Sequence, residues 1–323
     1  MQKKITLLHR YPRNQIVETN AAFPYLEAKG IDVLTFKKFD RLSSRKKFWK
    51  SLAWVFYAPL LVWGKGYDVI YCDDSYPFYP ALVKLFSPKS KVVIRLGDLH
   101  LMYYYSGWAY KFLHFFEKIA WGMADEILSI SEPMREYVGR GKVVLDPVDV
   151  SKFEPLGVSN AGHVMFHGVL TRNKNVDLLL SAAHRMPKTV FFIVGNGPDR
   201  ERLQRSAPKN VIFGGWVPFC EMQDWIDRCA VGVALRSDNP GNEYVVTSPF
   251  LQYGASGKPC LVTRRKVFGD YPWQFSGVNE MVDKLTELLK RPEEGEKLRQ
   301  YIVKNHDAKK IAEAIWKILQ SQS

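Results

Sequence analysis

Short runs of apolar residues alternate along this chain with longer stretches in which apolar positions recur at helical spacing. The short runs predict strands at residues 5–9, 31–36, 69–72, 92–96, 127–130, 143–145, 164–166, 189–194, 211–213, 231–235 and 260–263. These runs are mainly apolar at consecutive positions rather than at every second position, which is typical of strands buried on both faces. Strands that alternate with helices predict parallel sheets covered by helices on each side.

The alternating pattern is interrupted between residues 147 and 161, where turn-forming residues dominate. The chain has 323 residues, which is more than one hydrophobic core usually organises. We therefore predict an α/β protein with two doubly wound, Rossmann-like domains, residues 1–155 and 156–323, that face a shared cleft. The last helix is a candidate to pack back on the N-terminal domain. Ligands of doubly wound sheets bind beyond the carboxyl ends of the strands, so candidate chemistry is expected there.

Composition narrows the class of protein. Apolar residues make up 46% of the chain and charged residues 24%, which excludes a disordered chain, a collagen and a disulfide scaffold. The four cysteines lie far apart and form no CxxC pair, so a zinc site is not expected. The first residues do not resemble a signal peptide, which favours a cytoplasmic protein.

Positive charge is concentrated in one segment. The formal net charge is +13, and residues 37–50 contain seven basic side chains and one aspartate. Residues 51–63 are uncharged and include four aromatic side chains, but this run is shorter than the roughly 20 apolar residues that span a bilayer. Basic residues beside aromatic ones suit a segment that lies on an anionic membrane, so residues 37–63 are a candidate membrane surface. The alternative is a core helix preceded by a solvated basic stretch.

A second aromatic stretch lies at residues 103–121. Its residues Trp108, Phe112, Phe115 and Ile119 recur at helical spacing. An apolar stripe of this kind favours a helix face that is buried in the core. The alternative is that the stretch extends the candidate membrane surface.

Common nucleotide-binding motifs are absent. The first predicted strand is not followed by G-x-G-x-x-G, which argues against a hydride-transferring Rossmann enzyme, and no G-x-x-x-x-G-K-[S/T] indicates a P-loop nucleotidase. No Asp-x-Asp occurs, so the simplest carboxylate pair for a Mg²⁺ ion on a diphosphate is missing. We expect neither a cofactor nor a metal.

Three segments of the second half each follow a predicted strand and carry groups that suit a phosphate. They contain Gly168, Arg172 and Lys174, then Gly195, Asn196 and Gly197, and finally Ser248 and Pro249, which are the predicted N-cap and first residue of a helix. Glycines let a ligand approach the backbone, basic side chains bind phosphate, and a helix N-terminus attracts anions. A solvated basic loop and plain turns are the alternatives.

The order of these segments resembles the C-terminal domain of family 4 glycosyltransferases (glycosyl transferases group 1), which have the GT-B fold. That family shows a strand–Gly–x–Lys segment, an (I/V)VG-x-GP turn, an F-x-G-x-(V/I) strand, an acidic loop and an E-Y-x-A-x-GKP helix. The corresponding segments here are residues 168–174, 194–198, 213–217, 239–244 and 252–259. Residues 124–131 and 143–153 resemble the first half of the family more loosely.

The resemblance implies a retaining, metal-independent glycosyltransferase, hexosyltransferase-like, that moves a sugar from a nucleotide diphosphate-sugar to an acceptor hydroxyl. The C-terminal domain would bind the donor and the N-terminal domain the acceptor. Its implied donor-binding residues are Gly168, Gly195, Asn196, Gly197, Asn242, Glu243, Ser248, Pro249 and Gln252. The implied catalytic residues are Arg172 and Lys174, which would offset charge on the diphosphate, and Asp98, which would position or deprotonate the acceptor. Arg10, Arg13 and His100 are candidates for an acceptor or phosphate loop.

The chain departs from the family pattern at the paired glutamates. These glutamates fall on Tyr244 and Gln252 here, and Glu243 is the nearest substitute for the first. Gln252 still offers hydrogen bonds to a ribose hydroxyl, but as a neutral partner.

Two other classes remain open from the sequence. A GT-B nucleotide-sugar epimerase would share the donor site without needing the basic aromatic stretch. A nucleic-acid-binding protein would account for the net charge and the aromatic residues, although the charge is clustered and no RNA or DNA motif is present. The favoured partners are therefore a nucleotide diphosphate-sugar, a glycan or lipid-linked acceptor, and an anionic membrane surface on the cytoplasmic side.

Overall fold

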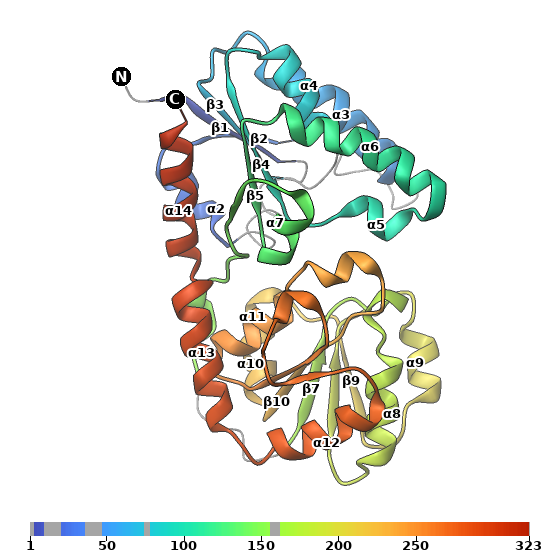
Figure 1. Cartoon of the computed structure of the whole chain (residues 1–323). Coiled ribbons are helices and arrows are strands. Elements are labelled where there is room, and N and C mark those ends of the chain that lie inside the picture. Colours follow the sequence, from blue (N-terminus) through green and yellow to red (C-terminus); the bar gives the residue numbers. More distant parts are fainter. Residues whose placement is uncertain (1–2, 10–20, 36–46, 74–77, 156–161, 323) are drawn as a thin grey trace. The chain divides into compact units, whose positions relative to one another are not determined.

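Two six-stranded parallel sheets organise the chain (Figure 1). The computed structural model describes residues 3–9, 21–35, 47–73, 78–155 and 162–322. The chain divides into unit 1, residues 1–147 and 308–323, and unit 2, residues 148–307. The division thus comes at Pro147 instead of the expected residue 155, and the residues from Ala308 onward belong to unit 1.

Unit 1 has the strand order β2-β1-β3-β4-β5-β6. Its strands are β1 (Ile5–His9), β2 (Asp32–Thr35), β3 (Val69–Asp73), β4 (Lys91–Leu96), β5 (Glu126–Ser129) and β6 (Lys142–Val143). Its helices are α2 (Phe23–Ala28), α3 (Lys47–Val62), α4 (Tyr79–Phe86), α5 (His100–Tyr104), α6 (Gly107–Met123), α7 (Glu132–Val138) and α14 (Ala308–Ser321). Leu7 and Tyr71 on one face of the sheet pack with Phe23 of α2 and Ile315 of α14. This apolar contact is the reason why the last helix belongs to unit 1.

Unit 2 has the strand order β12-β11-β10-β7-β8-β9. Its strands are β7 (Val164–His167), β8 (Phe191–Val194), β9 (Val211–Gly215), β10 (Val231–Ala234), β11 (Cys260–Thr263) and β12 (Gln274–Phe275). Its helices are α8 (Asp177–Arg185), α9 (Arg200–Ser206), α10 (Met222–Asp227), α11 (Ser248–Ala255), α12 (Val278–Leu288) and α13 (Glu293–Asn305).

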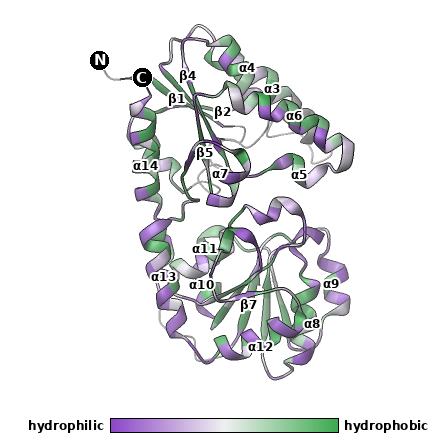
Figure 2. Ribbon diagram, in the orientation of Figure 1, coloured by the Kyte–Doolittle hydropathy of each residue, from purple (hydrophilic) through white to green (hydrophobic). Residues whose placement is uncertain are grey.

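Strand β7 shows why the strands are mainly apolar at consecutive positions. Its Val164 and Phe166 enter the core that α8 and α12 cover, whereas Met165 enters the core on the other face, with α11 and α13. Successive side chains of a strand point to opposite faces, so a sheet covered on both sides favours apolar residues at consecutive positions. Figure 2 shows the strands around β7 in hydrophobic colours.

The predicted fold class is confirmed. Each strand predicted from the sequence is present, with its ends shifted by one or two residues at most. The sequence missed β12, which has only two residues and pairs with β11 at the edge of the sheet. A strand this short carries too little pattern to be recognised.

Helix α6 contradicts its predicted environment. Its residues at helical spacing were expected in the core, but Trp108 is 77% and Phe115 is 61% exposed, and Phe112 and Ile119 are exposed as well. The buried residues of α6 lie on its other side and include Trp121. Periodicity shows which residues share a helix face, but it does not show whether another element covers that face.

The candidate membrane segment is only partly within the described residues. Residues 37–46 and the side chains of residues 47–52 lie outside them. In the described part of α3, Trp54 and Ala58 are buried, whereas Phe56 and Leu60 are exposed. One side of α3 therefore belongs to the core and the other faces outward. Within the described ranges, no helix combines the length and apolar character needed to cross a membrane.

Candidate functional site

The loops that follow β7 and β8 are joined by backbone hydrogen bonds at the carboxyl edge of the sheet of unit 2. Gly168 N–H donates to Val194 O at 2.9 Å, and Leu170 N–H donates to Asn196 O at 2.9 Å. In the other direction, Asp199 N–H donates to Leu170 O at 3.1 Å. The structure thus brings together the two glycine-containing segments that the sequence singled out.

This close approach requires glycine at two positions. Gly195 has a φ of +138°, and a Cβ atom there would lie 1.9 Å from Gly168 O. A Cβ atom at Gly197 would lie 2.3 Å from Leu170 O. Only glycine has no Cβ, so the sequence pattern here follows from the contact between two backbones.

We expect Gly195→Ala to destabilise unit 2 and to disturb the joined loops. Backbone strain and overpacking together should lower the free energy of unfolding by about 2 kcal/mol or more. Gly122→Ala is the control, because nothing lies within 4 Å of its added Cβ and its φ is not positive. Urea unfolding of both variants makes the comparison. Equal midpoints would contradict the packing argument.

A third loop, after β10, is attached to the loop after β7. Asn173 lies in the short helix η3 (Arg172–Lys174), and its Oδ1 accepts hydrogen bonds from Ser237 Oγ at 2.6 Å and Asn242 Nδ2 at 3.1 Å. Asn242 Nδ2 also donates to Ser237 O at 2.9 Å. Asn242 is fully buried and holds the loops together, whereas its direct contact with a donor remains a prediction.

The side chains that the sequence predicts to bind phosphate lie on these joined loops. Arg172 is 75% exposed, with its Nε 3.6 Å from Asp199 Oδ1. Lys174 is half-buried, and its charge acts on His167, the last residue of β7. Because η3 is attached to two other loops, both basic groups stand on a fixed backbone.

The sequence did not single out His167. This residue is buried, and its ring packs edge-on to the ring of Tyr253 in α11 with centroids 4.9 Å apart. Burial, and then the charge of Lys174, lower the pKa of His167 to about 3, so its imidazole is neutral at physiological pH. Its Nε2 has no hydrogen-bond partner among the described residues. A polar residue directly before Gly168, at a strand end, was the signal available in the sequence.

The start of α11 differs by one position from the prediction. Thr247, not Ser248, is the N-cap, because the Thr247 side chain accepts the hydrogen bond from Phe250 N–H. Ser248 is the exposed first residue of the helix and Pro249 the second. Threonine and serine both cap helices, so their order in the sequence could not decide between them.

Gln252 lies in the middle of α11. The Oε1 atom of Gln252 is buried and has no hydrogen-bond partner among the described residues. The next residue, Tyr253, donates from its hydroxyl to Met165 O at 2.9 Å and fixes the helix against β7. Gln252 therefore has an unused acceptor on a firmly attached helix.

Glu243 is held by residues that follow β11. Its Oε2 accepts Lys266 N–H at 2.9 Å, and its Oε1 lies 3.8 Å from Arg265 Nη1. Arg265 is nearly buried and donates to Ser237 O at 2.6 Å and Asp238 Oδ1 at 2.9 Å. Arg265 was not predicted from the sequence, although two consecutive basic residues after a strand, Arg264 and Arg265, are a recognisable signal.

Unit 1 has a cluster of buried charges at the carboxyl edge of its own sheet. Arg95 of β4 lies between Asp73 of β3, at 3.2 Å, and Asp146, at 2.5 Å. Burial raises the pKa of Asp146 to about 6 against the lowering effect of Arg95, and the charge of Asp98 raises it further. The predicted residue Asp98 thus lies close to this cluster, in the loop before α5, and His100 is the first residue of α5. Arg10 and Arg13 lie outside the described residues.

No metal-binding cluster is present in the part of the chain that the structure describes. Over these ranges, no group of three His, Cys, Asp or Glu side chains is placed to hold a metal ion.

Comparisons with known proteins bear on the family and the fold. Residues 161–321 match the family model described as glycosyl transferases group 1. A sequence search among curated proteins found no match.

Solved structures with the same fold cover almost the whole chain. Sucrose-phosphate synthase (tll1590) from Thermosynechococcus elongatus has 14% identity and a TM-score of 0.77, over 98% of each chain. Alr3699/HepE from Anabaena, solved in complex with UDP and glucose, has 14% identity and a TM-score of 0.72, over 99% of this chain and 100% of that one. The lipopolysaccharide outer core galactosyltransferase WaaB has 15% identity and a TM-score of 0.67, over 98% of this chain and 100% of that one. The chain therefore belongs to the glycosyl transferases group 1 and has the GT-B fold.

Proposed function

We propose that the protein moves a sugar, with retention of configuration, from a nucleotide diphosphate-sugar to an acceptor hydroxyl. Unit 2 would bind the donor and unit 1 the acceptor. The observation that carries this proposal is the set of three joined loops, which holds Arg172 and Lys174 on a fixed backbone. The similar Anabaena protein was solved with UDP and glucose, which supports a nucleotide-sugar donor.

Arg172 and Lys174 have an electrostatic role in this proposal. When the sugar leaves, negative charge develops on the departing diphosphate, and fixed cations stabilise that charge. The first turn of α11 adds the backbone N–H of Ser248, because Pro249 has no N–H and the Phe250 N–H is bound by Thr247. Because no Asp-x-Asp is available for a bridging cation, we propose that these groups act without a metal.

Glu243 and Gln252 orient the two sugar rings in this proposal. The unused Oε1 of Gln252 accepts a hydrogen bond from a ribose hydroxyl, which removes the penalty for a buried unpaired acceptor. Glu243, oriented by Lys266 N–H, accepts from the hydroxyls of the transferred hexose. Gly168, Gly195, Asn196 and Gly197 would form the surface on which the donor lies.

Asp98 acts on the acceptor in this proposal. It lies near Asp146 and Arg95 at the carboxyl edge of the sheet of unit 1, where doubly wound sheets bind their ligands. An aspartate there can position the acceptor hydroxyl and accept its proton. His100, the first residue of α5 and two positions after Asp98, would assist it.

Thermal unfolding with a panel of nucleotides tests the donor site. We expect one of UDP, GDP, ADP and dTDP, or its sugar, to stabilise the protein by about 2.7 kcal/mol at a hundred times its dissociation constant. Transfer with that donor should continue in EDTA. The absence of any nucleotide-dependent shift would contradict the donor site. Activity that is lost in EDTA and restored by Mn²⁺ would contradict the metal-free mechanism.

A further inference from the structure

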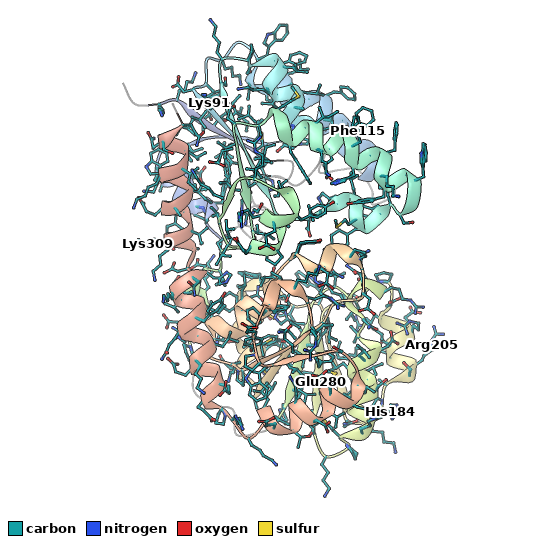
Figure 3. The ribbon with its side chains drawn as sticks, in the orientation of Figure 1. Lys91, Phe115, His184, Arg205, Glu280 and Lys309 are labelled. Carbon is teal, nitrogen blue, oxygen red and sulfur yellow. The ribbon has the colours of Figure 1, made fainter. Side chains whose placement is uncertain are left out.

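Large apolar side chains gather on the outer side of four helices of unit 1. Exposed residues of this kind are Phe56, Tyr57, Leu60 and Trp63 in and just after α3, Leu85 and Phe86 of α4, Tyr104 and Tyr105 in and just after α5, and Trp108, Phe112, Phe115, Phe116 and Ile119 of α6. We call this set the aromatic face. In Figure 3, Phe115 lies on the outer side of α6. Exposed apolar groups of this number mark an interaction surface, because single scattered ones are the usual pattern.

The aromatic face is continuous and ordered. Helix α3 packs on α4, α4 packs on α6, and α5 packs on α6 (Figure 1). The rings of Trp63 and Phe86 join α3 to α4 edge to face, with centroids 5.9 Å apart. Along α6, the ring of Phe112 lies between those of Trp108, at 5.4 Å, and Phe116, at 5.2 Å. The rings are held by one another at the surface, so little rotamer freedom is left to lose on binding.

The charges of these four helices have one sign. Their sequences contain five lysines and a single acidic residue, Glu117. Glu117 is buried, and burial raises its pKa to about 8, so its carboxyl is mostly protonated at neutral pH. It hydrogen-bonds to Nδ1 of His114 at 2.9 Å, and burial lowers the pKa of that histidine, so the pair is neutral. Lys84 of α4 is paired with Asp125 at 2.7 Å, so the positive charge on the described part of the aromatic face is that of the exposed Lys111 and Lys118.

The positions of two lysines on α6 suit a flat anionic surface. Lys111 and Lys118 are exposed and are seven residues apart, which places them two turns apart on the same side of the helix. Both lysines lie three residues after an aromatic residue of the exposed stripe, Lys111 after Trp108 and Lys118 after Phe115. Lysine beside exposed aromatic residues is the arrangement of helices that lie in the headgroup region of a bilayer.

We propose that the aromatic face binds the surface of an anionic lipid bilayer, with α6 lying along it and its aromatic rings at the level of the headgroups. A second copy of the chain fits less well, because two such faces would place lysines opposite lysines. The proposal goes beyond residues 37–63 by including α4, α5 and α6. One consequence of the proposal, that a lipid carries the acceptor hydroxyl, rests on the proposed function.

Co-sedimentation with vesicles tests the proposal. The full chain is mixed with vesicles of phosphatidylcholine alone, or of phosphatidylcholine with phosphatidylglycerol, at low and high salt. We expect binding to the anionic vesicles that weakens at high salt. Trp108→Ser combined with Phe115→Ser should weaken it about tenfold. Lys111→Glu combined with Lys118→Glu should weaken it on the order of a hundredfold.

Matched variants outside the aromatic face distinguish a specific effect of this face on vesicle binding from a general effect of charge or hydrophobicity. Lys309→Glu with Lys310→Glu changes two exposed lysines of α14, and Ile212→Ser removes an exposed apolar side chain of unit 2. Both should bind vesicles as the unchanged chain does. Thermal midpoints check that each variant is folded.

Three outcomes would overturn the proposal: no binding to anionic vesicles at low salt, equal loss in the α14 control, or a dimer in solution that Trp108→Ser dissociates. The nucleotide shift without vesicles is measured separately. Vesicle binding without any nucleotide-dependent change in the thermal midpoint would contradict the proposed function but not the binding of the aromatic face to a bilayer.

Discussion

Arg95→Met should lower the free energy of unfolding by about 3–5 kcal/mol, the largest stability effect that we expect of a single substitution in this protein. Arg95 is buried between the carboxylates of Asp73 and Asp146. These carboxylates raise the pKa of the Arg95 guanidinium although its burial alone would lower it. Removing the cation leaves two acidic groups in a poorly hydrated place without their partner, and such groups ionise only at a high energetic cost. Urea unfolding measures the loss.

The pH dependence distinguishes this cause from a simple packing defect. A carboxyl whose pKa is higher in the folded chain binds more protons when folded, so stability falls as pH rises between its unfolded and folded pKa values. For Asp146 this window runs from its ordinary pKa of 3.8 to about 6. Without Arg95 the window should extend to higher pH, so the variant should lose more stability at pH 8 than at pH 5.

Lys91→Met is the matched control for Arg95→Met. Lys91 is the first residue of the same strand, is partly exposed, and lies 3.6 Å from Asp125. Exposed ion pairs are worth about 1 kcal/mol or less, so this change should be small at both pH values. A loss in Arg95→Met that equals the loss in Lys91→Met, or that does not depend on pH, would contradict the burial argument.

The second large effect concerns turnover. Lys174→Ala and Arg172→Ala should each remove about 2–4 kcal/mol of transition-state stabilisation, which corresponds to roughly 30- to 1,000-fold in kcat. Both residues stand on η3, which Asn173 attaches to Ser237 and Asn242. Loss of their charge should leave the fold intact, because Arg172 is mostly exposed and Lys174 is half-buried. Steady-state kinetics and thermal midpoints measure the two effects.

Arg205→Ala is the control for these variants. Arg205 lies on α9, is exposed, and pairs with Glu201 at 3.3 Å. Its removal should change neither turnover nor stability by a measurable amount. Unchanged kinetics in both Lys174→Ala and Arg172→Ala would reject the assignment of the donor site.

The sequence predicted the framework of the site better than its details. The glycines at 168, 195 and 197 and the basic residues at 172 and 174 were recognisable, because glycine close behind a strand end indicates a backbone that something approaches closely. The structure added that these loops are joined to one another, through contacts such as that of Asn173 with Ser237, 64 residues apart in the chain. It also added His167 and Arg265, which the sequence did not single out although each lies at a strand end, because their burial is visible only in the packed chain.

The environment of a helix face was the weakest sequence prediction. For α6 the spacing of apolar residues was predicted correctly, but their exposure was not. A hydrophobic stripe has the same pattern whether the protein's own core or something outside the protein covers it. The single glutamate of α6 likewise gave no sign in the sequence that it is buried and mostly protonated.

The sequence by itself determined the two parallel α/β sheets, the family, and the loops with candidate chemistry. All of these follow from local features, because strands covered on both faces are mainly apolar at consecutive positions and backbones in contact need glycine. Only the tertiary structure decided the charge cluster around Arg95 and the exposure of the aromatic face, and it showed that α14, the candidate from the sequence, belongs to unit 1. These depend on which distant segments bury one another, and burial is a property of the packed chain that short-range patterns do not contain.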